Sequence, residues 1–159
     1  MRLRAMADSD VPTVLALNEP VSAMTSVLSA ERLRQLLGWA AYPRVVERDG
    51  RPVAFVLTFA AGSAYDSKYF GWFADRYDSF LYLDRIVVAE DHRRQGVGRF
   101  VYDAMEELAT PLGRLVCEVN LEPRNDASIA FHEGRGYVEV GQLADGTGRV
   151  SSMLAKDLG

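Results

Sequence analysis

The sequence has little cysteine and little histidine, and each shortage excludes a kind of chemistry. Its one cysteine, Cys117, cannot form a disulfide within the chain, so we expect a fold held by packing alone. Cys117 lies in the strand-like run 115–119, which supplies no adjacent cation or helix N-terminus to lower the pKa of a thiol. We therefore expect it to be buried and unreactive. Two histidines are too few for a histidine-based metal centre, so we expect no metal site.

Long apolar runs and a strong positive charge are also lacking. No segment approaches the length of a membrane span, and the N-terminal Met1–Arg4 leads into Asp8 and Asp10 without the apolar core of a signal peptide. The formal net charge of −4 argues against nucleic acid as the main partner. We therefore expect a soluble cytoplasmic protein that contacts neither membranes nor nucleic acids.

The sequence also lacks segments that would separate one domain from another. No Pro/Ser/Gly-rich segment, internal repeat or low-complexity tract divides the 159 residues, of which 48% are hydrophobic. A chain of this size can bury a substantial core. We expect residues 1–159 to form a single domain.

Apolar periodicity and turn residues predict about seven strands and about four helices. The expected strands are residues 1–6, 44–48, 52–60, 80–88, 115–120, 137–143 and 149–155. The expected helices are one after residues 8–10, one capped by Ser29, and two at 97–108 and 125–133.

Two Asp-Gly pairs, at 49–50 and 145–146, predict hairpin turns near the two ends of the chain. Strand–helix–strand crossovers lie between them, so the sequence predicts an α/β fold with a mixed, mostly antiparallel central sheet covered by helices on both faces. Residues 62–79 are rich in aromatic side chains but lack the alternation of a strand. We expect them to be irregular or partly helical.

A basic, glycine-containing turn at residues 93–99 follows a buried strand and opens an amphipathic helix. Gly96 and Gly98 remove side chains that would keep a phosphate away from backbone N–H groups, and the flanking arginines add positive charge. The pattern therefore predicts a site for a pyrophosphate. A turn that only caps the helix remains the alternative.

Two other phosphate-binding motifs do not fit these residues. A nucleoside-triphosphatase loop ends in Gly-Lys-Ser/Thr, whereas Gly98 is followed by Arg99 and Phe100. A dinucleotide fingerprint requires a third glycine at the position of Val101. Neither nucleotide class is predicted.

Residues 93–98, which follow Ile86-Val87-Val88, resemble the acetyl-CoA signature of the GNAT acyltransferase superfamily, Gln/Arg-x-x-Gly-x-Gly/Ala after the fourth strand. The run Asn125-x-x-Ser128-x-x-Phe131-His132, with Gly136-Tyr137 after it, is similar to the second CoA motif of that family. Together with the order of elements, the resemblance covers nearly the whole chain.

The resemblance implies the acyl-CoA N-acyltransferase fold, in which strands four and five splay apart and the pantetheine arm lies in the gap. It also implies a set of residues that bind acetyl-CoA through main-chain groups or nearby side chains. These are Ile86, Val87, Val88, Arg93, Arg94, Gln95, Gly96, Val97, Gly98, Arg99, Asn125 and Ser128.

The activity implied by the resemblance is direct transfer of an acetyl group from acetyl-CoA to an amine. This reaction requires a neutral amine, a polarised thioester carbonyl and a proton for the leaving thiolate. Asn125, Ser128 and His132 are spaced i, i+3, i+7 on one helix face, which by resemblance points toward the CoA sulfur.

His132 is the candidate acid on that face, where many members of the family carry tyrosine. With an ordinary pKa near 6.5, about a quarter of such a histidine is protonated at pH 7. A histidine that only caps or packs at the helix end remains the alternative.

Candidate bases lie on the two strands that would flank the cleft: Tyr82, Asp84 and Glu118. Asp84 precedes Arg85, so it either forms a structural ion pair or takes a proton from the amine, directly or through water. Glu118 lies in an apolar strand, where an unpaired carboxylate is costly to bury. It therefore either faces outward or has a function. If neither carboxylate acts, the base lies elsewhere or is unnecessary.

The layout of the family and the density of aromatic residues predict an acceptor site built from Asn18 and Glu19 after the first helix and from Tyr65 and Asp66. Plain packing of the aromatic side chains is the alternative. Two competing functions remain: a domain that binds CoA without turnover, and a nucleotide-binding regulator. A homodimer is the default expectation for the assembly.

Overall fold

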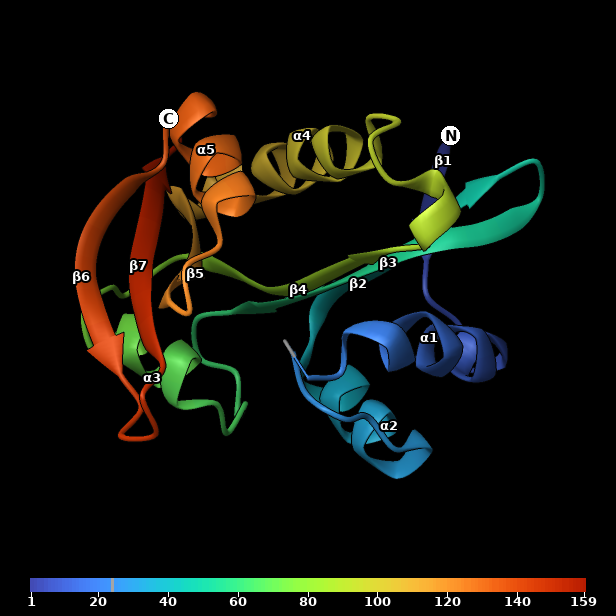
Figure 1. Ribbon diagram of the computed structural model, residues 1–159, viewed down its shortest axis with the longest axis horizontal. Helices are drawn as coiled ribbons and strands as arrows, with labels where there is room; N and C mark the ends of the chain where they lie inside the picture. The colour runs from blue at the N-terminus through green and yellow to red at the C-terminus, as the bar shows by residue number, and fades with distance from the viewer. Residues whose placement is uncertain (24) are drawn as a thin grey trace.

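A seven-stranded sheet forms the middle layer of the computed structural model, which describes residues 1–23 and 25–159 (Figure 1). Its strands lie in the order β1-β2-β3-β4-β5-β7-β6, and the one parallel pair is β4 with β5. The strands are β1 (Arg2–Ala5), β2 (Ala41–Arg48), β3 (Arg51–Ala60), β4 (Leu81–Val88), β5 (Arg114–Glu122), β6 (Val138–Ala144) and β7 (Val150–Asp157). The expected mixed, mostly antiparallel sheet is confirmed.

Five α-helices occur in the described part of the chain, one more than expected. They are α1 (Val11–Asn18), α2 (Ala30–Trp39), α3 (Lys68–Ala74), α4 (Val97–Ala109) and α5 (Asp126–Gly134). The additional helix, α3, forms in the aromatic stretch because Ser67 accepts hydrogen bonds from the backbone N–H groups of Tyr69 and Phe70. Ser29 caps α2 in the same way, as predicted. No helix among the described residues is long and apolar enough to cross a membrane.

The helices form two layers, with α4 and α5 on one face of the sheet and α1, α2 and α3 on the other (Figure 1). Buried side chains form one cluster against each face. The cluster under α1–α3 includes Leu33, Phe73 and Tyr82, and the cluster under α4 includes Val101 and Met105. Each such fully buried side chain contributes about 2 kcal/mol of hydrophobic stabilisation, so the sheet is anchored from both sides.

The turn between β2 and β3 forms as the Asp-Gly pair predicts. Asp49 and Gly50 have φ values of 54° and 75°, the left-handed pair that a two-residue hairpin turn requires. The hairpin pairs β3 with β2, and the other edge of β3 pairs with β4, which forms one wall of the gap described next.

A β-bulge in β4 and a short ladder with β5 open the sheet at its middle. Thr58 pairs with Leu83 and Leu57 pairs with Arg85, which leaves Asp84 as the extra residue. The bulge reverses the alternation of side chains, so that Val87 packs on the α1–α3 face whereas Ile86 packs on the α4 face. The ladder between β4 and β5 contains two pairs, at Leu81↔Leu115 and Tyr82↔Val116. Beyond these pairs the two strands diverge, which is the splay that the resemblance implied.

Candidate active site

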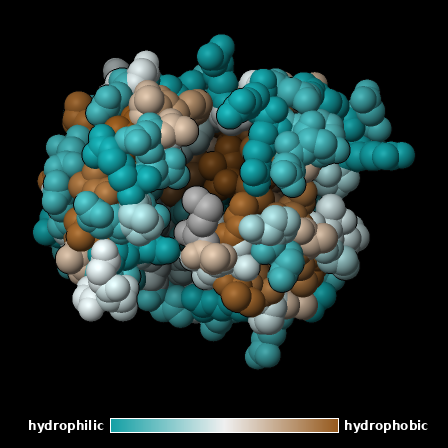
Figure 2. Space-filling view, in the orientation of Figure 1, coloured by the Kyte–Doolittle hydropathy of each residue, from teal (hydrophilic) through white to brown (hydrophobic). Residues whose placement is uncertain are grey.

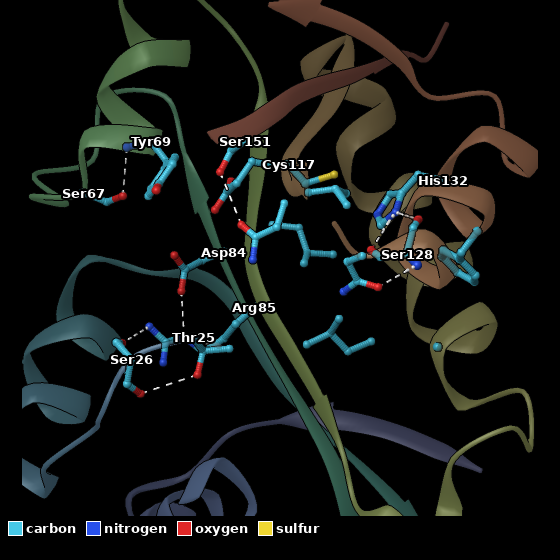
Figure 3. A pocket seen from close by; sticks show the side chains of 18 of the residues that line it. Thr25, Ser26, Ser67, Tyr69, Asp84, Arg85, Cys117, Ser128, His132 and Ser151 are labelled. Carbon is cyan, nitrogen blue, oxygen red and sulfur yellow. Dashed lines mark hydrogen bonds and ion pairs between the residues drawn. The ribbon is translucent and has the colours of Figure 1, made fainter. Parts of the chain in front are cut away.

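The splay between β4 and β5 contains a cavity of about 540 Å³. Both strands, α4, α5 and the stretch that leads into α3 contribute side chains to its walls. Figure 2 shows the hollow near the centre of this face, with apolar residues inside it and on part of its rim and hydrophilic residues on the rest of the rim. Several polar groups converge there from segments far apart in the sequence (Figure 3).

The N-terminus of α4 forms an open cradle at one end of this region. Gly96 has the left-handed φ of 82°, and no side chain caps the helix, so its first backbone N–H groups keep no partner within the helix. A Cβ atom built at Gly96 or Gly98 meets no heavy atom within 4 Å, so the approach to these groups is open. An uncapped N-terminus with the positive end of the helix dipole fits the phosphate groups of a ligand.

The predicted cradle residues have distinct positions around this turn. Arg93, Arg94, Gln95 and Arg99 are exposed, whereas the Val97 side chain is buried in the core. Gln95 is held by Arg48 and by the backbone carbonyl of Asp91. The arginines therefore add charge around the cradle, and Val97 can contribute its main-chain N–H group alone.

The divergent half of β4 presents an unpaired backbone edge to the cavity. Ile86 and Val88 line the cavity, whereas the side chain of Val87 packs in the core on the other face. An unpaired strand edge offers N–H and C=O groups to an extended, amide-containing ligand. The geometry therefore suits a pantetheine arm between the cradle and the middle of the sheet.

The first turn of α5 brings Asn125 and Ser128 to the opposite wall. The Asn125 side chain caps the helix by accepting a hydrogen bond from the Ser128 backbone N–H at 3.1 Å. Both residues and His132 line the cavity, so they share one face of the helix, as their spacing predicted.

His132 is buried, with 6% of its surface exposed, and both of its ring nitrogens have partners. Nδ1 lies 2.7 Å from the backbone carbonyl oxygen of Ser128, and Nε2 lies 2.7 Å from the hydroxyl of Tyr102. A carbonyl oxygen can only accept, so Nδ1 carries the proton and Nε2 accepts the Tyr102 hydrogen. Burial lowers the pKa of His132, so less of it is protonated at pH 7 than its ordinary pKa suggests.

Glu118 reaches the cavity from β5 and binds the hydroxyl of Tyr82, which lies 2.9 Å and 2.8 Å from its two carboxylate oxygens. Burial, followed by the charge of Asp84, raises the pKa of Glu118 to about 8. Tyr82 itself is fully buried, and burial raises its pKa. The Tyr82 hydroxyl therefore contacts the Glu118 carboxylate, and Glu118 in turn lines the cavity.

Asp84, at the bulge, is held from two sides. Its Oδ2 accepts a hydrogen bond from Arg85 Nε at 2.8 Å, and its Oδ1 accepts one from the Tyr65 hydroxyl at 2.7 Å. The side chains of Asp84 and Arg85 are 9% and 7% exposed. The pair is thus a buried ion pair at the edge of the cavity.

The predicted acceptor residues divide into two groups. Tyr65 lines the cavity, and the buried Asn18 holds the neighbouring loop by donating to the Ser26 carbonyl at 2.8 Å. Glu19 is exposed and does not line the cavity, and the exposed Asp66 pairs with Arg32 outside it.

Sequence reasoning missed several residues that line the cavity. Tyr102 belongs to the buried stripe of α4, and its helical spacing from Gly98 was a usable signal. Ser26, Tyr69, Arg149 and Ser151 reach the cavity through long-range packing that no local pattern reveals.

Comparisons with known proteins agree with this geometry. A family model described as the acetyltransferase (GNAT) family matches residues 15–137. No curated protein matches the sequence.

Solved structures match the fold over nearly all of the chain. The ribosomal-protein-alanine N-acetyltransferase from Brucella melitensis is 24% identical with a TM-score of 0.73, and the match covers 99% of this chain and 100% of that one. Ard1 from Thermoplasma volcanium is 17% identical with a TM-score of 0.77, covering 99% and 97%. Naa20 from Chaetomium thermophilum, in complex with a bisubstrate analogue, is 16% identical with a TM-score of 0.76, covering 99% and 87%. At these identities the likeness shows the fold.

Proposed function

Because the chain belongs to the acetyltransferase (GNAT) family, we propose that it transfers the acetyl group of acetyl-CoA directly to a primary amine of a small molecule or peptide. One observation carries the proposal. The unpaired edge of β4, the start of α4 and a carboxylate with a raised pKa all border one cavity.

Acetyl-CoA supplies an acyl group that is activated as a thioester. The backbone N–H groups of residues 94–99 would bind its pyrophosphate, with Arg93, Arg94 and Arg99 adding charge. The unpaired edge of β4 at residues 86–88 would bind the pantetheine arm, and Asn125 and Ser128 would line its other side. These contacts orient the acyl group and so reduce the entropic cost of reaction.

Glu118 is the residue that we assign as the base. A carboxylate with a pKa of about 8 is closer in proton affinity to an amine than an ordinary carboxylate is, so it can take the ammonium proton efficiently. Asp84 is less suited, since Arg85 and Tyr65 already occupy its oxygens. We assign Asp84 the role of holding Tyr65 and Arg85 in the part of the cavity wall where the amine would bind.

Calorimetry and a thiol assay on the wild-type protein test this proposal. We expect heat of binding with acetyl-CoA, and release of free thiol when amino acids, polyamines, aminoglycosides or N-terminal peptides are added. Binding without thiol release for any amine would indicate a domain that binds acyl-CoA as a sensor or structural unit. Absence of both signals would contradict the proposal.

The same proposal extends to the domain organisation, location and partners of this chain. Residues 1–159 would act as one N-acetyltransferase domain in the cytoplasm, with acetyl-CoA and an amine as partners and without nucleic acid, membrane or metal. A homodimer is the assembly that we propose, and light scattering on the purified protein measures it directly.

A further inference from the structure

The wall of the cavity between α4, β5 and α5 holds a further hydroxyl group, that of Tyr102. Tyr102 lies one turn after Gly98 on α4, so both face the same way and are separated by about 6 Å along the helix axis. Tyr102 and Gly98 both line the cavity. The α4 face thus leads from the phosphate cradle to the Tyr102 side chain.

His132 has no proton to offer to the cavity in its neutral form. Its Nδ1 proton is committed to the Ser128 carbonyl, and its Nε2 lone pair accepts the Tyr102 hydrogen at 2.7 Å. The groups around the ring are Tyr102 and Glu106 on α4, and Arg135 and Tyr137 after α5. Burial and then the charge of Arg135 oppose a positive charge on the ring, and the Ser128 carbonyl and Glu106 only partly offset them.

The candidate base for the amine and the candidate acid for the thiol lie on opposite faces of the sheet. Glu118 and Cys117 are adjacent on β5 and therefore point to opposite faces of the sheet. Cys117 and Tyr102 belong to the core under α4, whereas Tyr82, the partner of Glu118, belongs to the core under α1–α3. A base that receives the amine proton and an acid that serves the thiol thus lie on opposite sides of the splay.

We propose that Tyr102 gives the proton to the departing CoA thiolate and that His132 is a positioning residue that holds the Tyr102 hydroxyl in place. This inference rests on the proposed function. It assigns the acid role to α4 rather than to α5.

The protons and electrons balance with the groups present. Glu118 takes one proton from the incoming ammonium, and the neutral amine then attacks the thioester carbonyl. When the C–S bond breaks, its electron pair stays on sulfur. The Tyr102 hydroxyl, which unlike a ring N–H can rotate, turns its hydrogen from His132 Nε2 to that sulfur and gives up the proton. The second amine proton passes to solvent. When the products leave, Glu118 releases its proton to solvent and the Tyr102 phenolate regains one, so one proton is released per turnover.

The environment makes this transfer feasible. Burial raises the pKa of the Tyr102 phenol, but it also raises the pKa of the Cys117 thiol in the same core. A CoA thiolate produced beside them would likewise be a stronger base than in water. The pKa of the proton donor, Tyr102, and the pKa of the proton acceptor, the CoA thiol, are therefore raised together.

Three variants test the assignment, after calorimetry has shown that each binds acetyl-CoA as the wild type does. Tyr102→Phe keeps the ring and loses the proton, so we expect kcat to fall about 100-fold with KM for the amine unchanged. His132→Gln keeps an oxygen that can accept the Tyr102 hydrogen, so we expect it to retain most of the wild-type kcat and the wild-type pH profile. His132→Ala cannot hold the hydroxyl and should lose about 10-fold in kcat.

A spectroscopic readout is independent of turnover. Nitrogen-15 NMR of His132 should show the Nδ1–H tautomer at about pH 8, because burial lowers the pKa of the ring and Nδ1 donates to the Ser128 carbonyl. Tyr102→Phe should shift the Nε2 resonance, since the hydrogen bond is lost. An Nε2–H tautomer in the wild type would overturn the inference even if Tyr102→Phe fails to fold.

The outcomes separate the two proposals. If the wild type binds acetyl-CoA and acetylates an amine while Tyr102→Phe keeps the wild-type kcat, the role of Tyr102 is overturned and the proposed function stands. Equal loss in His132→Gln and His132→Ala would assign the acid to His132 instead. If the wild type neither binds acetyl-CoA nor releases thiol, the proposed function fails and this inference fails with it.

Discussion

At the scale of single residues, neighbours give Asp84 and Glu118 different chemistry although both are carboxylates beside one cavity. Arg85 and Tyr65 occupy the oxygens of Asp84, so this side chain is tied into the structure. Glu118 is held by one shared hydroxyl, that of Tyr82, and burial raises its pKa to about 8. Glu118 is therefore a carboxyl group whose protonation changes near neutral pH.

The pH dependence of turnover follows from this pKa. A base must be ionised, so kcat/KM of the wild type should rise between about pH 7 and about pH 9 and then level off. Glu118→Gln preserves the shape and the hydrogen bond from Tyr82, yet it should lower kcat/KM about 100-fold at pH 8 and remove this rise. Steady-state kinetics across this pH range measures both effects.

Two controls make that experiment specific. Glu122→Gln changes an exposed carboxylate on the same strand and should leave the profile as in the wild type. Two acceptors with different amine pKa values should give the same midpoint, because the midpoint belongs to the enzyme. A Glu118→Gln profile that still rises with the wild-type midpoint would remove Glu118 from the role of base.

At the scale of elements, the residue at the start of α4 must both adopt a left-handed φ and leave the first N–H groups of the helix open to a ligand. Gly96 adopts a φ of 82°, which costs other residues free energy, and it stands in front of the first N–H groups of the helix. Its missing side chain leaves that approach open. One residue thus serves both the turn and the ligand.

Gly96→Ala should therefore weaken the protein in two measurable ways. The strained φ should lower the free energy of unfolding by about 1 kcal/mol, and the added methyl group should weaken CoA binding about 10-fold. Gly38→Ala is the matched control, since Gly38 lies in α2 with open space around it and should slightly stabilise the helix. Urea denaturation and calorimetry give the two quantities. A Gly96→Ala protein that binds CoA as tightly as the wild type would show that the cradle lies elsewhere.

The elements that could be predicted from sequence are those with a local signal. Turn chemistry at 49–50, the Ser29 cap and the stripe of α4 each depend on neighbouring residues, and all three are present in the structure. The bulge at Asp84 depends instead on pairing with β3, which is a tertiary contact. The cap of α3 by Ser67 is local, but the irregular pattern of the aromatic residues around it obscures the helix.

The same limit applies to the site. The cradle and the α5 face were visible as motifs, because each comes from one continuous segment. The contact between Tyr102 and His132 joins residues 30 positions apart, and that between Tyr82 and Glu118 joins residues 36 apart. Pairings across the fold decide pKa values and tautomers, so the sequence could offer candidates but not their protonation.

At the scale of the whole molecule, the cleft places a titratable carboxyl group inside the fold, and that group links stability to pH. Glu118 has a pKa of about 8 in the folded protein, compared with 4.5 for an ordinary glutamate. Between these two values the folded state binds more protons than the unfolded state. The free energy of unfolding contributed by this group therefore falls as pH rises through this window, and it stays low above it.

Glu118→Gln should remove this loss of stability. We expect the variant to match the wild type near pH 5 and to exceed it by about 2 kcal/mol near pH 9, less than the full pKa shift would give because water in the cavity screens the carboxylate. Other groups with shifted pKa values, such as Asp10, Glu106 and His132, titrate in both proteins and cancel in the difference. Urea denaturation followed by circular dichroism at several pH values, with Glu122→Gln alongside, measures the difference. The same substitution should lower turnover, so a gain in stability at high pH would mean that the fold gives up stability to keep a base in its cleft. Equal stability of the two proteins at every pH would mean that Glu118 is not desolvated in the folded protein.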